Sequence, residues 1–172
     1  MSDLPPDTSF WPVNKILTRE QARDTAEQLK RARQRLVTVN GSFDILHAGH
    51  LSFLGEAKSQ GDILFVGLNS DRSVREKKGQ SRPFIAEQER AALVAALACV
   101  DYVVIIDAAY DEVPRTLLQT IKPTLHVNGE EYGQPQQWVE WPTMQAVGTA
   151  GYVVSRRPAL STSALVNKIK AS

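Results

Sequence analysis

Short apolar runs alternate along this chain with longer segments whose apolar residues recur at the helical period. The run at residues 62–68 is apolar almost throughout, which is typical of a strand covered on both faces. Strands are predicted at residues 36–39, 62–68, 102–106, 124–127 and 151–155. Helices are predicted at residues 18–33, 44–59, 86–98, 113–120 and 162–170. This alternation predicts right-handed crossovers and an α/β fold, a doubly wound parallel sheet with helices on both faces.

The length suits one domain, which we expect at residues 15–172, after a proline-rich N-terminal tail at residues 1–14. Of the 172 residues, 42% are hydrophobic and 23% are charged, values that exclude disordered, collagen-like and coiled-coil chains. The formal net charge is +1, which argues against a nucleic-acid partner. Small molecules are the expected partners.

Three features favour a cytoplasmic protein. Cys99 is the one cysteine, so no intramolecular disulfide can form, and a reducing compartment is the natural setting. The longest apolar stretch, residues 93–100, is far shorter than a membrane span, so no membrane partner is expected. The first residues, 1–7, lack the basic start and apolar core of a secretory signal.

The most informative polar cluster follows the first predicted strand and contains His47, Gly49 and His50. Two histidines three residues apart at a helix start share one side, where free backbone N–H groups and the helix dipole attract anions. Gly49 leaves room for a nucleoside triphosphate to approach the backbone. We expect phosphate binding here. The alternatives are a metal site made by Asp44, His47 and His50, and purely structural histidines.

Several segments carry a family resemblance, the first being Gly41-Ser-Phe-Asp-Ile-Leu-His-Ala-Gly-His50, which contains a His-x-Gly-His motif. The others are residues 66–74, 82–90, 97–104 and 160–163. In this order they resemble the cytidylyltransferase-like nucleotidylyltransferases, and within them the D-glycero-β-D-manno-heptose 1-phosphate adenylyltransferases. The resemblance implies a Rossmann-like fold. It also implies a reaction in which a sugar 1-phosphate oxygen attacks the α-phosphorus of ATP and pyrophosphate leaves.

The cluster and the resemblance together suggest roles for individual residues. The expected catalytic residues are His47, His50 and Lys77. The expected nucleotide-binding residues are Gly41, Ser42, Phe43, Gly49, Asn128, Gly129, Arg156, Ser161, Thr162 and Ser163. The expected substrate-binding residues are Asp44, Asp71, Lys78, Arg82 and Arg90. Mg²⁺ is expected on the phosphates of ATP, with no metal site in the protein itself.

Three basic positions have ordinary structural alternatives. Residues 73–83 are interpreted as a mobile basic loop that closes over the substrate, although a solvated charge run is the commoner explanation. Arg82 and Arg90 could clamp a phosphate, whereas a salt bridge from Arg90 to Glu87 is the alternative.

Asp44 and the hydroxyls of residues 161–163 likewise have both a functional and a structural interpretation. Asp44 could face the substrate or cap the helix that carries the histidines. The hydroxyls of residues 161–163 could form a phosphate cradle or an ordinary helix cap.

Two segments depart from the heptose adenylyltransferases. Those proteins usually have Lys-Gly-Gly-Asp-Tyr after the fourth strand, where this chain has Asn128-Gly-Glu-Glu-Tyr132. A lysine is therefore lost and a carboxylate gained. Residues 134–144, with Trp138 and Trp141, are interpreted as a packed surface loop, the alternative being a lid or sugar platform.

The function that the resemblance implies is adenylyl transfer to heptose 1-phosphate, a step in making precursors of lipopolysaccharide or another surface glycan. A cytidylyltransferase for glycerol 3-phosphate or another phosphorylated alcohol is the alternative enzyme. A nucleotide-binding module without catalysis is the alternative of another class. The resemblance also leads us to expect a homodimer.

Overall fold

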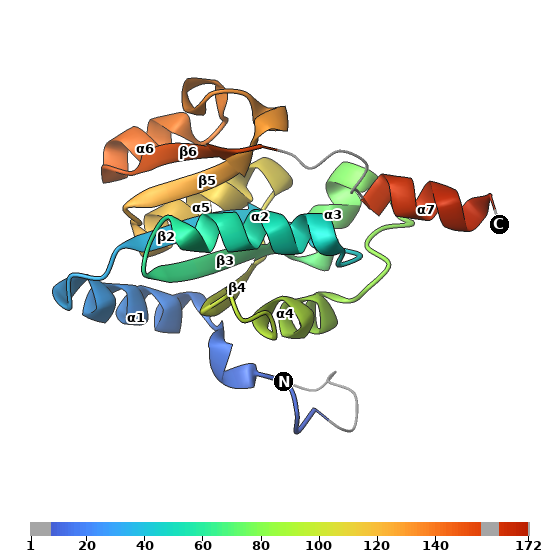
Figure 1. The fold of residues 1–172 in the computed structure, drawn as a ribbon, viewed down its shortest axis with the longest axis horizontal. Helices are drawn as coiled ribbons and strands as arrows, with labels where there is room; N and C mark the ends of the chain where they lie inside the picture. Colours follow the sequence, from blue (N-terminus) through green and yellow to red (C-terminus); the bar gives the residue numbers. More distant parts are fainter. Residues whose placement is uncertain (1–7, 156–161, 172) are drawn as a thin grey trace.

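The computed structural model describes residues 8–155 and 162–171. A six-stranded parallel sheet forms its centre, with strand order β1-β4-β3-β2-β5-β6 (Figure 1). The strands are β1 (Ile16–Leu17), β2 (Leu36–Gly41), β3 (Ile63–Asn69), β4 (Tyr102–Ile106), β5 (Leu125–Gly129) and β6 (Ala150–Val154). The predicted α/β fold, a doubly wound parallel sheet, is confirmed.

The helices are α1 (Arg19–Arg31), α2 (Ala48–Ser59), α3 (Asp71–Lys78), α4 (Glu87–Ala95), α5 (Val113–Ile121), α6 (Trp141–Val147) and α7 (Thr162–Lys170). Helices α2 and α4 pack on one face of the sheet, and α1 and α5 pack on the other. Residues of β3 alternate between these two cores: Leu64 and Val66 point to the first, and Phe65 points to the second. This burial on both faces explains why β3 is apolar almost throughout.

The chain order reverses beside β2. From β2 the chain proceeds to β3 and β4 on one side, and α5 then carries it back to β5 and β6 on the other side (Figure 1). In open parallel sheets the crevice at such a switch point, beyond the carboxyl ends of the strands, is where ligands bind. The residues that follow β2 and β5 are therefore placed to meet in one site.

The predicted loop at residues 73–83 is wrong in its first half, because residues 71–78 form α3. Ser70 caps this helix by accepting a hydrogen bond from the Ser73 N–H, and Arg72 pairs with Glu76 one turn later. Gly79, with φ +93°, ends it in the left-handed region. The charge run is thus the polar surface of a short helix.

The interpretation of residues 134–144 as a loop also missed a helix, α6, which begins at Trp141 and ends before Gly148 at φ +73°. Met144 of α6 and the neighbouring Trp138 are buried against Leu118 of α5. This third, small core fixes the chain between β5 and β6.

Strand β1 and the start of α2 also differ from the prediction. The short edge strand β1, which pairs with β4, was not predicted. The helix expected from residue 44 begins only at Ala48. In the part of the chain that the structure describes, no helix is both long and apolar enough to cross a bilayer.

Candidate active site

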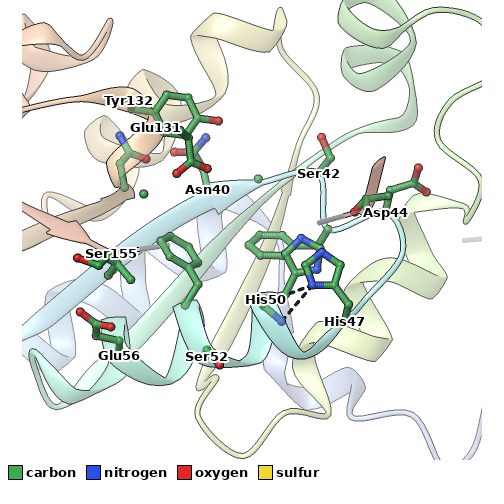
Figure 2. A pocket seen from close by; sticks show the side chains of 18 of the residues that line it. Asn40, Ser42, Asp44, His47, His50, Ser52, Glu56, Glu131, Tyr132 and Ser155 are labelled. Carbon is green, nitrogen blue, oxygen red and sulfur yellow. Dashed lines mark hydrogen bonds between the residues drawn. The ribbon is translucent and has the colours of Figure 1, made fainter. Parts of the chain in front are cut away.

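A cavity of about 560 Å³ opens at the carboxyl ends of β2, β5 and β6, beside the N-terminus of α2 (Figure 2). Many residues expected in the site line it: Gly41, Ser42, Phe43, Asp44, His47, Gly49, His50, Lys78, Asn128, Gly129 and Thr162. Other lining residues were not assigned to the site from the sequence: Asn40, Ser52, Phe53, Glu56, Tyr110, Glu131, Tyr132, Val154 and Ser155. The motif located the cavity, and the remaining wall comes from elements that carry no recognised motif.

A tight turn connects β2 to the histidines. Phe43 adopts φ +45° and is buried, so its ring folds back over the end of the strand. A Cβ on Gly41 would lie 2.9 Å from the Phe43 ring, closer than real Cβ contacts allow. Glycine at position 41 is therefore required by this close approach. The Phe43 ring in turn meets His50 edge-on, with centroids 5.2 Å apart.

His47 is the N-cap of α2. Its Nδ1 atom accepts hydrogen bonds from the backbone N–H groups of Gly49 (3.1 Å) and His50 (3.3 Å). Because Nδ1 is an acceptor, the neutral ring of His47 carries its hydrogen on Nε2. The two imidazoles stack with centroids 3.8 Å apart and an interplanar angle of 19°. Figure 2 shows both rings at the cavity, on the same side of the helix start, as the spacing predicted.

His50 is neutral at physiological pH. Burial lowers its pKa to about 4, and electrostatic interactions with His47 and Lys78 lower it further. Its Nδ1 atom is buried without a hydrogen-bond partner among the described residues. A phosphate would supply the negative charge that the neighbourhood of His50 lacks, so the imidazole is poised to respond to an anion.

Asp44 does not cap α2. Its carboxylate accepts hydrogen bonds from Arg82 Nη1 (2.8 Å), from the Phe84 N–H (2.7 Å) and from the Ile85 N–H (3.1 Å). It lines the cavity, yet both of its oxygens are already engaged. This geometry does not support the alternative of a metal site made with His47 and His50. Arg82 is held by the same carboxylate and is not among the residues that line the cavity.

Arg90 does not reach the cavity either. Its side chain is fully buried, with Nε donating to the Ile85 carbonyl, Nη1 to the Ser42 carbonyl and Nη2 to Asp71 (2.6 Å). This geometry does not support the expected phosphate clamp for Arg90. It agrees with the alternative of a salt bridge, with Asp71 as the partner in place of Glu87. Arg90 instead braces the turn after β2 against the start of α3. Asp71, expected to bind substrate, is the partner in this brace and does not line the cavity.

The two lysines at the end of α3, Lys77 and Lys78, have different surroundings. Lys77 points to Asp111 (3.4 Å) and lies over the Tyr110 ring, 5.5 Å from its centroid, and it does not line the cavity. Lys78 does line it. Partial desolvation lowers the pKa of Lys78, opposed by Asp44 and helped by Arg82 and Arg90. The structure thus places Lys78 at the site, where the sequence had favoured Lys77 as the catalytic lysine.

The opposite wall comes from β5 and the 3-10 helix that follows it at Glu130–Tyr132. A Cβ on Gly129 would lie 2.2 Å from a Glu131 carboxylate oxygen, so the missing side chain lets that carboxylate lie against the strand. Desolvation and the charges of Tyr110, Glu131, Glu140 and Asp111 raise the pKa of Tyr132 to about 12. This wall is acidic, in contrast to the wall with the histidines.

Helix α7 brings Thr162 to the cavity at its N-terminus. Arg156 and Ser161, two of the expected phosphate contacts, lie outside the described residues. The side chain of Ser163 lies outside them as well. The predicted helix at residues 162–170 is confirmed, and the phosphate cradle at its start remains a prediction.

Sequence comparison agrees with this geometry. A family model described as cytidylyltransferase-like matches residues 38–170, from within β2 to the end of α7. The chain belongs to the cytidylyltransferase-like family. Family membership makes it a nucleotidyltransferase, which confirms the prediction of an enzyme made from the His-x-Gly-His resemblance.

Among curated proteins, the chain is similar to several called bifunctional protein HldE. The HldE of Syntrophotalea carbinolica is 40% identical over 156 residues, which are 91% of this chain and 31% of that protein. The HldE of Helicobacter pylori strain J99 is 41% identical over the same shares of both proteins. That of Geobacter metallireducens is 43% identical over 136 residues, 79% of this chain. The chain thus spans about a third of the length of these relatives.

Solved structures include a lipopolysaccharide core biosynthesis protein from Thermoplasma volcanium, with a TM-score of 0.57 and 26% identity. The matched region covers 72% of this chain and 97% of that protein. A pantoate-beta-alanine ligase from Francisella tularensis has a TM-score of 0.61 at 20% identity, over 91% of this chain and 78% of that one. The second similarity shows the shared Rossmann-like fold.

Proposed function

We propose that this chain transfers AMP from ATP to D-glycero-β-D-manno-heptose 1-phosphate, giving an ADP-sugar and pyrophosphate. The observation that carries the proposal is the stacked pair His47 and His50 at the N-terminus of α2, facing a cavity large enough for a nucleotide. The similarity to HldE proteins and to a lipopolysaccharide core biosynthesis protein supports this substrate class. The product would then serve lipopolysaccharide or surface-glycan synthesis.

In the proposed reaction, a phosphate oxygen of the sugar 1-phosphate attacks the α-phosphorus of ATP. The bond from the α-phosphorus to the bridging oxygen breaks, and pyrophosphate leaves with that oxygen. No proton has to be transferred and no covalent enzyme intermediate forms. The protein's task is to position the two substrates and to stabilise charge as it moves onto the leaving group.

Each wall has a part in this scheme. His47 and His50 donate to phosphate oxygens and stabilise the transition state, aided by backbone N–H groups at the start of α2. Lys78, beside Asp44, takes the phosphate of the sugar. Gly41, Ser42, Phe43, Gly49, Asn128, Gly129 and Thr162 shape the nucleotide site. Mg²⁺ enters on the triphosphate as part of the substrate.

The deciding experiment is a matrix of pyrophosphate release in the presence of Mg²⁺. ATP and CTP are crossed with heptose 1-phosphate, other hexose 1-phosphates and glycerol 3-phosphate. Release with ATP and heptose 1-phosphate alone is the expected result. Release with CTP and glycerol 3-phosphate would establish the alternative cytidylyltransferase, and no release with any pair would overturn the proposed reaction.

Two further expectations accompany this function and stay predictions. The homodimer is checked by sedimentation or by light scattering of the purified chain. The cytoplasmic location is checked by fractionation of the source cells.

A further inference from the structure

A buried carboxylate lies directly behind the β5 wall of the cavity. Glu140 precedes α6 and is only 3% exposed. Its Oε1 atom accepts a hydrogen bond of 2.7 Å from the side-chain amide nitrogen of Asn128, on β5. Asn128 itself lines the cavity. A carboxylate out of reach of substrate therefore touches a residue within reach of it.

The same carboxylate is anchored from below by a second buried side chain. His126 Nε2 lies 3.3 Å from Glu140 Oε1, and His126 Nδ1 lies 2.8 Å from the Thr38 hydroxyl. Burial works to raise the pKa of Glu140, but contacts with His126, its own backbone and Asn128 outweigh burial and lower it. Glu140 is consequently ionised at neutral pH.

An ionised carboxylate can only accept hydrogen bonds, and this fixes which way the Asn128 amide turns. The amide nitrogen must face Glu140, so the amide oxygen faces away from it. That oxygen has no hydrogen-bond partner among the described residues and is not enclosed by them. Asn128 therefore presents an acceptor to the cavity, where the heptose adenylyltransferases usually carry a lysine, a donor.

The charges of the cavity indicate which part of a substrate reaches this acceptor. His47, His50 and Lys78 gather at one end, where Asp44 is paired with Arg82. Glu56 and Glu131 lie at the other end, with Tyr132 and Ser155 (Figure 2). Phosphate groups carry negative charge and favour the first end. The uncharged nucleoside is left for the second end, where Asn128 lies.

We propose that Glu140 is a positioning residue that turns the Asn128 carboxamide, whose oxygen accepts a hydrogen bond from the nucleoside and so selects for a donor group there. The donor is a ribose hydroxyl or the exocyclic amine of the base. This inference rests on the proposed function for its choice of a nucleotide, and it adds a specificity device that the family motif does not contain.

The test measures nucleotide binding by calorimetry in the absence of sugar phosphate. ATP is compared with ITP, which has a carbonyl in place of the amine, and with 2′-deoxy-ATP and 3′-deoxy-ATP. We expect the wild type to bind one of these analogues about three- to tenfold more weakly than ATP, the loss of one hydrogen bond. Which analogue is weaker identifies the donor. Equal binding of all four nucleotides would overturn the inference.

Variants separate the positioning role from a merely structural one. In Glu140→Gln the neighbouring group can donate as well as accept, so the Asn128 amide can turn over, and the preference for ATP over the weak analogue should fall to less than twofold. Asn128→Ala, which leaves Glu140 and His126 in place, should lose the same preference. Glu76→Gln is the matched control, because Glu76 pairs with Arg72 on the surface of α3, outside the cavity, and should keep the wild-type ratio. A Glu140→Gln protein that keeps the full preference would contradict the positioning role.

The design also separates this inference from the proposed reaction. Turnover with heptose 1-phosphate but no discrimination among the four nucleotides overturns the Asn128 inference alone. Discrimination without turnover on any sugar phosphate overturns the proposed reaction alone. If Glu140→Gln does not fold, the Asn128→Ala comparison still decides whether the Asn128 carboxamide makes the selective contact, and an Asn128→Ala protein that keeps the full preference overturns the inference.

Discussion

The two walls of the cavity are built in different ways. The histidine wall is one continuous stretch from Gly41 to His50, in which a turn, a helix cap and two imidazoles follow one another in sequence. The β5 wall depends on Glu140, which lies 12 residues after Asn128 and beyond two 3-10 helices. Local sequence therefore encodes the first wall, whereas the tertiary fold assembles the second.

Even the local wall needs support from a distance. Arg90 on α4 holds the Ser42 carbonyl, the Ile85 carbonyl and Asp71 at once, and so joins the turn after β2 to the start of α3. Asp44 joins the same turn to the segment before α4. The reactive groups of the histidine wall are therefore contiguous in sequence, whereas the residues that hold them in place come from distant segments.

We expect the largest effect on stability from replacing Arg90, which supports the histidine wall from a distance. Arg90→Gln leaves Asp71 and two carbonyls without their buried partner, and we expect it to lower the free energy of unfolding by about 3–5 kcal/mol. Chemical denaturation of wild type and variant measures this difference. Arg72→Gln is the matched control, because Arg72 is half exposed and solvent screens its pairs with Glu76 and Asp107, so the free energy of unfolding should change far less. Equal losses in the two variants would show that Arg90 is no brace.

The next effect tests the chemistry of the histidine wall. His50→Ala removes one preorganised group near the reacting phosphate, and kcat for pyrophosphate release should fall about 10²- to 10³-fold. Among the described residues, the His50 side chain makes no hydrogen bond and no ion pair, so the midpoint of thermal unfolding should change little. A fall in kcat of less than tenfold, with the fold intact, would contradict its role in the transition state.

The sequence predicted the fold well wherever the hydrophobic period was strong. Strands β2 to β6 and helices α1, α2, α4, α5 and α7 were all found, and the capping box at Thr18 and Gln21 marked the start of α1 correctly. Strand β1 was missed because two residues cannot show a period. Helix α3 was missed because its interior is charged and only Ser70 and Gly79 mark its ends.

For the site, the motif predicted where the cavity lies but not which residues contact one another around it. His47, His50 and the glycines were placed correctly at the cavity because their geometry is set by neighbours in sequence. Arg90 was misassigned because an arginine that serves a buried carbonyl and one that serves a phosphate look alike in sequence. Glu140 carried no signal, because its partners His126 and Asn128 are chosen by the packing of α6.

A smaller effect, on the KM for the sugar phosphate, is expected at the end of α3, where two adjacent lysines have different surroundings. Lys78→Gln removes a cation from the cavity, and the KM for the sugar phosphate should rise about tenfold. Lys77→Gln removes only an exposed pair with Asp111 and should change that KM less than twofold. Steady-state kinetics of the two variants measure both values. The reverse order would restore Lys77 as the substrate contact.

The smallest effect that we expect is a pH dependence of stability and of ATP affinity, caused by protonation of His50. The pKa of His50 is lowered to about 4 in the free protein, below its ordinary value of 6.5. As pH falls from 6.5 towards 4, the unfolded chain therefore takes up a proton that the folded chain does not, and folding stability decreases. A bound triphosphate favours the protonated ring, so its affinity should change in the opposite direction and rise by about threefold between pH 7 and pH 5.

Calorimetry of ATP binding across this range, with His50→Gln as the control, measures the proton uptake directly. A variant that keeps the full pH dependence would assign it to another group. The β5 wall then gives the internal comparison. Asn128 does not titrate, so Asn128→Ala should weaken binding equally at both pH values. A wall that acts by charge responds to pH, whereas a wall that acts by orienting an amide does not.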